Sequence, residues 1–241
     1  MRQSTDLSGL LRTEPKAQTD FTFIDPPFSR NHPNVSTYPA EVTGRFILAS
    51  MCRRLGWPSL KDRKLLDFGC GVRMTQTIVN LGMDVGLYAG VDTDRGVVDW
   101  LRQTVADDRF RFEHINMRNP MYNSEGIMPA ANALTDLGLR DFGAMCMFSV
   151  ITHNAPDEAA AIFSMAREAV ANDGRLYFTA FIDESLDGYA EGDPANPRLL
   201  STYAPALLIE VLNDCGWLVS DVYPSTPFQQ TVFLCGKKSA V

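Results

Sequence analysis

An acid and two glycines close a short apolar run near residue 67, and their spacing is the clearest chemical signal in the chain. Residues 64–71 read Lys-Leu-Leu-Asp-Phe-Gly-Cys-Gly. Because glycine has no Cβ, the backbone at Gly69 and Gly71 can approach a ligand closely, and the N-terminus of a following helix would face the same ligand. The carboxylate of Asp67 would repel a pyrophosphate. The motif therefore favours a cationic, amine-bearing ligand.

A second acid, Asp92, ends the next apolar stretch, one strand–helix–strand unit after the glycine turn. A carboxylate can accept both hydroxyl protons of a ribose, and ligand-binding acids occur at this place in chains that alternate strands and helices. Its neighbour Asp94 is expected to cap the next helix. The alternative for Asp92 is an acid that stabilises a turn and binds nothing.

Alternating apolar and amphipathic segments must position these residues. We expect strands at residues 65–68, 87–91, 110–114, 144–150, 175–181, 217–222 and 231–235. We expect helices at residues 39–55, 74–81, 93–105, 156–170 and 205–215, with a loop or short helix within 128–139. This alternation predicts an α/β fold with a parallel sheet and right-handed crossovers, and the last two strands suggest one antiparallel strand.

The ordered motifs resemble the class I S-adenosylmethionine (SAM)-dependent methyltransferases over about residues 40 to 238. Residues 65–71 look like motif I of that family. Further segments that follow in the family's order are residues 90–92, 112–116, 147–153 and 173–176. The resemblance implies a Rossmann-like, seven-stranded, mostly parallel sheet with one antiparallel strand and helices on both faces.

The resemblance also implies a SAM site. Asp67 would order the glycine loop and reach the methionine part of SAM through water, and Asp92 would hold the ribose. The other cofactor-binding candidates are Gly69, Gly71, Thr93, Asn116, Met117 and Phe148. The alternatives are a loop residue for Asn116 and core packing for Met117.

The glycine loop departs from the family pattern, because the run Gly-Cys-Gly-Val-Arg at residues 69–73 lacks the third glycine that many relatives carry. We therefore expect a shorter or reshaped loop. Arg73 is expected to be solvated, and the alternative is an ion pair with an acid.

The methyl acceptor is expected to meet SAM at the end of the fourth strand. Candidate substrate-binding residues are Ser149, His153, Tyr38 and Tyr203. His153 is the candidate catalytic residue, since a neutral imidazole can take a hydroxyl proton as the methyl group transfers. This favours an oxygen acceptor slightly. The alternative is a structural histidine, because methyl transfer can also proceed by positioning alone.

Outside the motifs, the chain divides into an N-terminal arm at residues 1–38 and one domain at 39–241. The acidic segment at about 183–203 is long for a connection and is expected to form a lid over the acceptor pocket. Asp25-Pro26-Pro27-Phe28 imitates a motif of amino-methyltransferases but precedes the glycine turn. We interpret it as a proline turn in the arm.

Composition narrows the class of protein further. The chain has 22 basic and 29 acidic residues, a net charge of −7, which argues against a nucleic-acid substrate. We find no apolar run long enough to span a membrane and no signal-peptide pattern. Five scattered cysteines suggest reduced thiols in a cytoplasm, and three dispersed histidines do not give metal-ligand spacing.

The sequence thus favours a cytoplasmic SAM-dependent methyltransferase for a small or medium-sized acceptor. It also allows the protein to form a homodimer. One alternative is a catalytically inactive SAM-fold binding or regulatory subunit, which the shortened glycine loop supports. A less favoured alternative is an NAD(P)-dependent oxidoreductase. Its glycine motif would need glycine at position 74, which is Met74, and it would not normally place Asp67 against the pyrophosphate.

Overall fold

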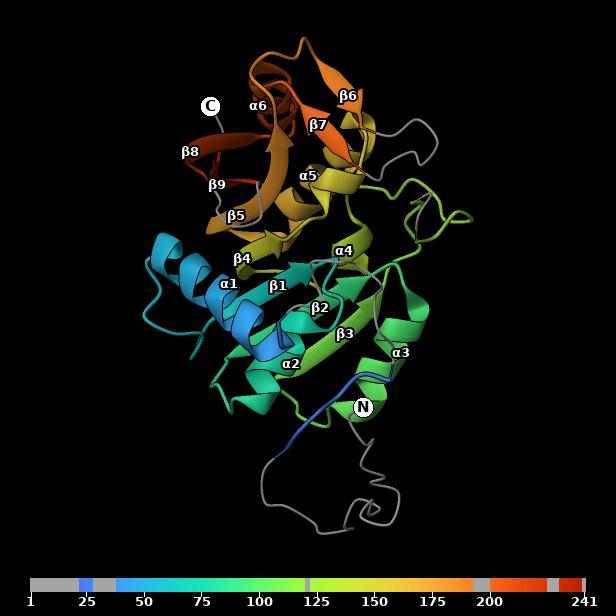
Figure 1. Ribbon diagram of the computed structural model, residues 1–241, viewed down its shortest axis with the longest axis vertical. Helices are drawn as coiled ribbons and strands as arrows, with labels where there is room; N and C mark the ends of the chain where they lie inside the picture. The colour runs from blue at the N-terminus through green and yellow to red at the C-terminus, as the bar shows by residue number, and fades with distance from the viewer. Residues whose placement is uncertain (1–21, 28–37, 120–121, 193–199, 225–229, 240–241) are drawn as a thin grey trace, which may run out of the picture.

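The predicted strands form one sheet, which lies between two layers of helices (Figure 1). The computed structural model describes residues 22–27, 38–119, 122–192, 200–224 and 230–239. Its strands are β1 Lys64–Phe68, β2 Leu87–Asp92, β3 Phe110–His114, β4 Phe142–Met147, β5 Val170–Ile182, β6 Tyr189–Glu191, β7 Ser201–Tyr203, β8 Trp217–Pro224 and β9 Thr231–Lys237. Its helices are α1 Ala40–Leu55, α2 Arg73–Asn80, α3 Arg95–Thr104, α4 Ala133–Asp136, α5 Pro156–Ala169, α6 Pro205–Asp214 and the 3₁₀ turn η1 Ile151–His153.

Seven of these strands run in the order β3-β2-β1-β4-β5-β9-β8. The first five pair in parallel, β9 pairs antiparallel with β5, and β8 pairs antiparallel with β9. The prediction of a mostly parallel, seven-stranded sheet with one antiparallel strand is therefore confirmed. Because parallel strands that meet in one sheet end at the same edge, the segments after β1, β2 and β4 come together there.

Helices cover both faces of the sheet, so the central strands are apolar on both sides. Leu65 and Leu66 are adjacent in β1, and both are fully buried. Their side chains point to opposite faces, since successive residues of a strand alternate. Leu65 packs in the cluster that α1, α2 and α3 share, and Leu66 packs in the cluster that α4, α5 and α6 share.

The acidic segment after β5 is the largest departure from the expected architecture. Within the expected lid at 183–203, the structure forms the antiparallel hairpin β6–β7, while residues 193–199 lie outside the described residues. Strand β7 also pairs in parallel with Phe181 and Ile182 at the end of β5. The hairpin therefore extends the sheet at its carboxyl edge, where a loop was expected.

Residues 22–27 are the described part of the N-terminal arm, apart from Tyr38, and they lie against α2. Ile24 is buried, its N–H donates to Oδ1 of Asn80 at 2.7 Å, and its carbonyl accepts from Nδ2 of Asn80 at 3.0 Å. Phe28 of the proline motif falls outside the described residues. Among the helices that the structure describes, none has the length and apolarity needed to cross a membrane.

Asp67 lies in the core where β1, β2 and β4 pair. It is 1% exposed, and its carboxylate accepts hydrogen bonds from the hydroxyl of Tyr88 and, at 3.7 Å, from the thiol of Cys146. Burial raises the pKa of Asp67 to about 7, although the two hydrogen bonds act in the opposite direction. The structure thus gives Asp67 partners within the core, and its predicted contact with SAM through water stays a prediction.

Because Asp67 is buried, we predict that it makes the free energy of unfolding depend on pH, and that the variant Asp67→Asn loses this contribution. Between pH 3.8 and about 7, only the folded protein holds a proton on Asp67, so unfolding releases that proton. The free energy of unfolding should therefore fall with rising pH across this window, by at most about 1.4 kcal/mol per pH unit from this group. Urea unfolding of the wild-type protein and Asp67→Asn across the window measures the difference.

Asp108→Asn, at an exposed acid, serves as the control and should keep the wild-type pH profile. Wild-type and Asp67→Asn curves that run parallel from pH 4 to pH 7 would contradict a buried, protonated Asp67.

Candidate functional site

The candidate site lies at the carboxyl edge of the sheet, where the turn after β1 meets the end of β2. Gly69 and Gly71 have φ angles of 72° and 49°, in the left-handed region that glycine adopts without strain. A Cβ on Gly69 would lie 2.5 Å from Cγ2 of Val150, which follows β4. The first glycine is therefore required both by its backbone angle and by the close approach of Val150.

The glycine loop directs its N–H groups at β2. The N–H groups of Gly69 and Cys70 donate to the carbonyl of Val91 at 2.8 and 3.0 Å. The N–H of Gly71 donates to Oδ2 of Asp92 at 2.8 Å. These three donors are therefore satisfied within the protein.

Asp92 connects the two motifs of the site. It is 6% exposed, and its Oδ1 accepts the N–H of Asp94 at 3.0 Å while Oδ2 accepts that of Gly71. Both carboxylate oxygens therefore accept a backbone N–H at the edge of the sheet. Asp94 accepts from the N–H of Val97 at 3.2 Å at the start of α3, which confirms its predicted role as a helix cap.

Arg73, the first residue of α2, pairs with a hydroxyl group, where solvent or an acid was expected. It is half-buried, and its Nη1 donates to the hydroxyl of Thr43 in α1 at 2.9 Å. Burial lowers the pKa of this guanidinium. The close packing of α1 on α2 explains the difference, because a Cβ on Gly44 would lie only 2.0 Å from Oγ1 of Thr77.

The residues predicted for the adenine side fall into different environments. Asn116 is exposed, and its Oδ1 accepts from Nδ2 of Asn123 at 3.0 Å. Met117 is 3% exposed and packs in the apolar core, which corrects its predicted contact with adenine in favour of core packing. Thr93 is half-buried directly after Asp92.

The end of β4 was predicted at residue 150, but the strand ends at Met147. The ring of Phe148 packs against that of Tyr177, with the centroids 5.5 Å apart. Ser149 has a φ angle of 55°, an uncommon conformation for a residue with a side chain, and its N–H donates to Oγ1 of Thr179 at 2.9 Å. This left-handed residue turns the chain out of the sheet.

The hydroxyl of Ser149 is exposed and pairs with the amide of Gln230, which donates from Nε2 at 2.9 Å. Gln230 directly precedes β9, far from Ser149 in the sequence. Gln230 was not predicted, since an isolated glutamine beside a proline-rich loop carries no motif.

The turn that carries His153 is held by hydrogen bonds from two other segments. Nδ2 of Asn119 donates to the carbonyl of His153 at 3.2 Å, and the hydroxyl of Tyr203 donates to the carbonyl of Asn154 at 2.6 Å. The half-buried imidazole meets the ring of Tyr122 edge-on, with the centroids 6.0 Å apart. Asn119 and Tyr122 were not predicted, because they lie in a loop after β3 without a recognisable pattern.

Two tyrosines predicted to bind substrate are placed differently. Tyr203 is fully buried, so its bond to Asn154 positions the His153 turn, and the predicted contact with an acceptor is corrected. Tyr38 is 62% exposed just before α1. In the part of the chain that the structure describes, no group of three His, Cys, Asp or Glu residues is arranged to hold a metal ion.

Comparison with solved structures places this geometry in a known fold. The glycopeptide N-methyltransferase MtfA complexed with S-adenosylhomocysteine (SAH) is similar, with a TM-score of 0.58, 14% identity, and coverage of 83% of this chain and 91% of that one. CcbJ from Streptomyces caelestis gives a TM-score of 0.56 at 14% identity, covering 86% of this chain and 96% of its own.

Magnesium protoporphyrin IX methyltransferase (ChlM) from Synechocystis PCC 6803, solved with bound SAM, gives a TM-score of 0.51 at 18% identity, covering 83% of this chain and 79% of its own. No protein-family model matches the chain. These similarities extend over most of both partners, and with the strand order they show that the chain has the fold of the class I SAM-dependent methyltransferases.

Proposed function

We propose that this protein is a SAM-dependent methyltransferase that acts on a small or medium-sized acceptor. The observation that carries the proposal is the junction of Gly71 and Asp92 at the carboxyl edge of the sheet. It places a nearly buried carboxylate at the end of β2, at the edge of the sheet where open α/β folds bind nucleosides. The two hydroxyl groups of the SAM ribose match that acceptor.

The direction of the glycine-loop N–H groups argues against a dinucleotide. A pyrophosphate is bound largely by backbone N–H donors at such a turn and at the following helix. Here the N–H groups of Gly69, Cys70 and Gly71 are bonded to Val91 and Asp92. SAM has no phosphate and does not need these donors. The bonding of these N–H groups within the protein thus favours SAM over NAD(P).

The names of the similar structures support the same choice. MtfA was solved with sinefungin, SAH and SAM, and ChlM with SAM. MtfA is named as a glycopeptide N-methyltransferase, and a similar enzyme from Burkholderia thailandensis acts on 1,6-didemethyltoxoflavin. By analogy with these proteins, a small-molecule acceptor is proposed here.

When bound, SAM would supply a methyl group on a sulfonium, which an acceptor atom displaces in line. The protein must then align the two partners and exclude water. Asp92 would hold the ribose, Gly69 would allow the ligand to approach the backbone, and the turn from Ser149 to His153 would face the acceptor. Bonds from Thr179, Asn119 and Tyr203 to this turn fix its backbone, as alignment requires.

A direct test compares SAH binding to the wild-type protein and to Asp92→Asn by calorimetry. The wild-type protein should bind SAH at micromolar concentration. Removing the charge that the ribose hydroxyls would meet should weaken binding about 10-fold or more, since hydrogen bonds to charged groups are the stronger ones.

Asp94→Asn is the matched control, because asparagine caps a helix as well as aspartate and Asp94 lies two residues away. Its affinity should equal that of the wild-type protein. A wild-type protein that does not bind SAH at millimolar concentration, or equal affinities for Asp92→Asn and the wild-type protein, would refute the proposed cofactor site.

We further propose an oxygen acceptor, with His153 as the base that takes the hydroxyl proton. In a screen of hydroxyl-bearing small molecules that follows SAH release, His153→Gln should lower kcat about 100-fold or more without changing SAH affinity. His114→Gln, at the end of β3, is the control and should retain activity. A fall in kcat of only a few-fold for His153→Gln would assign His153 to positioning alone.

A second candidate function is a binding or regulatory subunit with this fold. The glycine loop favours it, because residues 69–73 lack the third glycine of the family pattern. The SAH titration separates the two candidates, since this one requires weak or absent SAH binding.

A further inference from the structure

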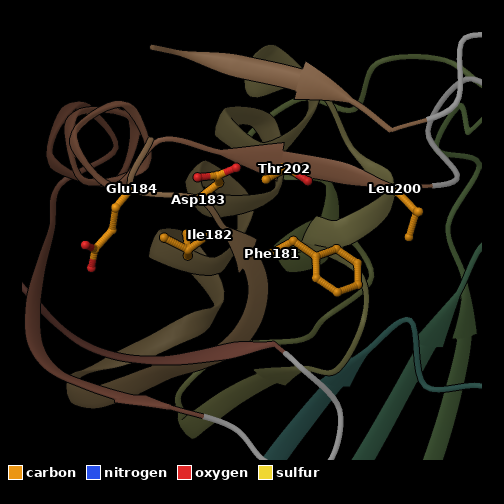
Figure 2. Close-up of a pocket in the computed structure, with 6 residues that line it drawn as sticks. All are labelled: Phe181, Ile182, Asp183, Glu184, Leu200 and Thr202. Atoms are coloured by element: carbon orange, nitrogen blue, oxygen red, sulfur yellow. The ribbon is translucent and has the colours of Figure 1, made fainter. Parts of the chain in front are cut away.

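A hollow of about 470 Å³ lies at the carboxyl end of β5, between that strand and the β6–β7 hairpin (Figure 2). Its lining comes from the end of β5, the residues directly after it, and the start of β7. The lining residues are Phe181, Ile182, Asp183, Glu184, Leu200 and Thr202. The residues of the proposed SAM site do not contribute to this lining.

The hollow adjoins the strand end that carries the proposed acceptor turn. Thr179, two residues before Phe181 in β5, accepts the hydrogen bond from the N–H of Ser149. Strand β5 pairs in parallel with β4, so both strands end at the same edge of the sheet. A molecule in the hollow therefore lies on the acceptor side of the sheet.

One side of the hollow is apolar. In Figure 2, Leu200 lies at one end of the lining, Phe181 lies nearer its centre, and the half-buried Ile182 lies below Asp183. Leu200 is 43% exposed, so covering it with an apolar group would remove hydrocarbon surface from water. This wall suits the hydrocarbon or aromatic body of a ligand.

The other side of the hollow carries negative charge. Oδ1 of Asp183 accepts the N–H and the hydroxyl of Ser185 at 2.8 and 2.6 Å, and these bonds lower the pKa of this carboxyl. Asp183 therefore stays ionised near neutral pH. Figure 2 shows Asp183 beside Thr202, with Glu184 at the far end of the lining.

The sequence around the hollow is predominantly acidic. Residues 183–203 contain five acids, Asp183, Glu184, Asp187, Glu191 and Asp193, and one basic residue, Arg198. The six described lining residues include no basic side chain. An apolar wall next to carboxylates in a predominantly acidic segment is complementary to a cation with an apolar body.

We propose that the hollow binds the protonated amine and the apolar body of an amine-bearing small molecule, which is the methyl acceptor. Its role as the acceptor site rests on the proposed function, whereas the affinity for a cationic ligand does not. A protonated amine has no lone pair with which to accept a methyl group. The ammonium therefore serves recognition, and a second nucleophilic group of the same molecule takes the methyl.

Three probes with one aromatic body and different charge test the proposal: 2-phenylethylamine, 2-phenylethanol and 3-phenylpropionate. Calorimetric titrations of the whole protein, with and without SAH, should rank the amine first and the carboxylate last. The double variant Asp183→Asn/Glu184→Gln should weaken amine binding about 5-fold or more and leave the alcohol unchanged, since each exposed ion pair contributes modestly. Asp187→Asn, in the same acidic segment but outside the lining, should have a smaller effect.

A carboxylate probe that binds as tightly as the amine, amine binding that the double variant leaves unchanged, or a lack of binding by all three probes would overturn the proposal. SAH affinity, measured on the same variants, should stay at the wild-type value. If the amine binds as expected but SAH does not bind, the cationic site stands and the proposed methyltransferase function fails.

Discussion

The hydrogen bond from the N–H of Gly71 to the carboxylate of Asp92 joins the two segments on which the candidate site depends. It ties the turn after β1 to the end of β2, and the bonds from Gly69 and Cys70 to the carbonyl of Val91 reinforce it. The bond fixes the position of the carboxylate and also removes a backbone donor from the ligand side. The site is thereby suited to the hydroxyl groups of a ribose and poorly suited to a pyrophosphate.

The acceptor side is organised by fixing the chain where it leaves β4. Ser149 holds a left-handed conformation, which costs of order 1–3 kcal/mol and persists only where surrounding contacts impose it. The N–H of Ser149 is held by Thr179 in β5 and its hydroxyl by Gln230 before β9, while Tyr203 in β7 holds the carbonyl of Asn154 further along the chain. The backbone that carries the imidazole of His153 is therefore fixed by segments that are distant in the sequence.

Much of the fold could be predicted because it follows from local patterns. Continuous apolar runs and glycine turns located the central strands, and Asp94 was recognised as a cap from its place before a helix. The end of β4 was missed because Val150 and Ile151 are apolar for another reason: Val150 packs on Gly69, and Ile151 lies in the core. Apolarity alone does not distinguish a strand from a buried turn.

The site was predicted less completely, because tertiary partners decide how a side chain is used. The family pattern points to Asp67 as a ligand contact, yet Tyr88 and Cys146 hold it in the core. Gln230 and the β6–β7 hairpin had no signal at all, since their roles arise only when distant segments meet.

The most direct test of this account is a crystal structure of the protein with SAH. The account predicts both ribose hydroxyl groups on the carboxylate of Asp92, with the bond from Gly71 retained. The proposed site would be contradicted by SAH bound away from the ends of β1 and β2, or by a complex in which the hydrogen bond from Gly71 to Asp92 is broken.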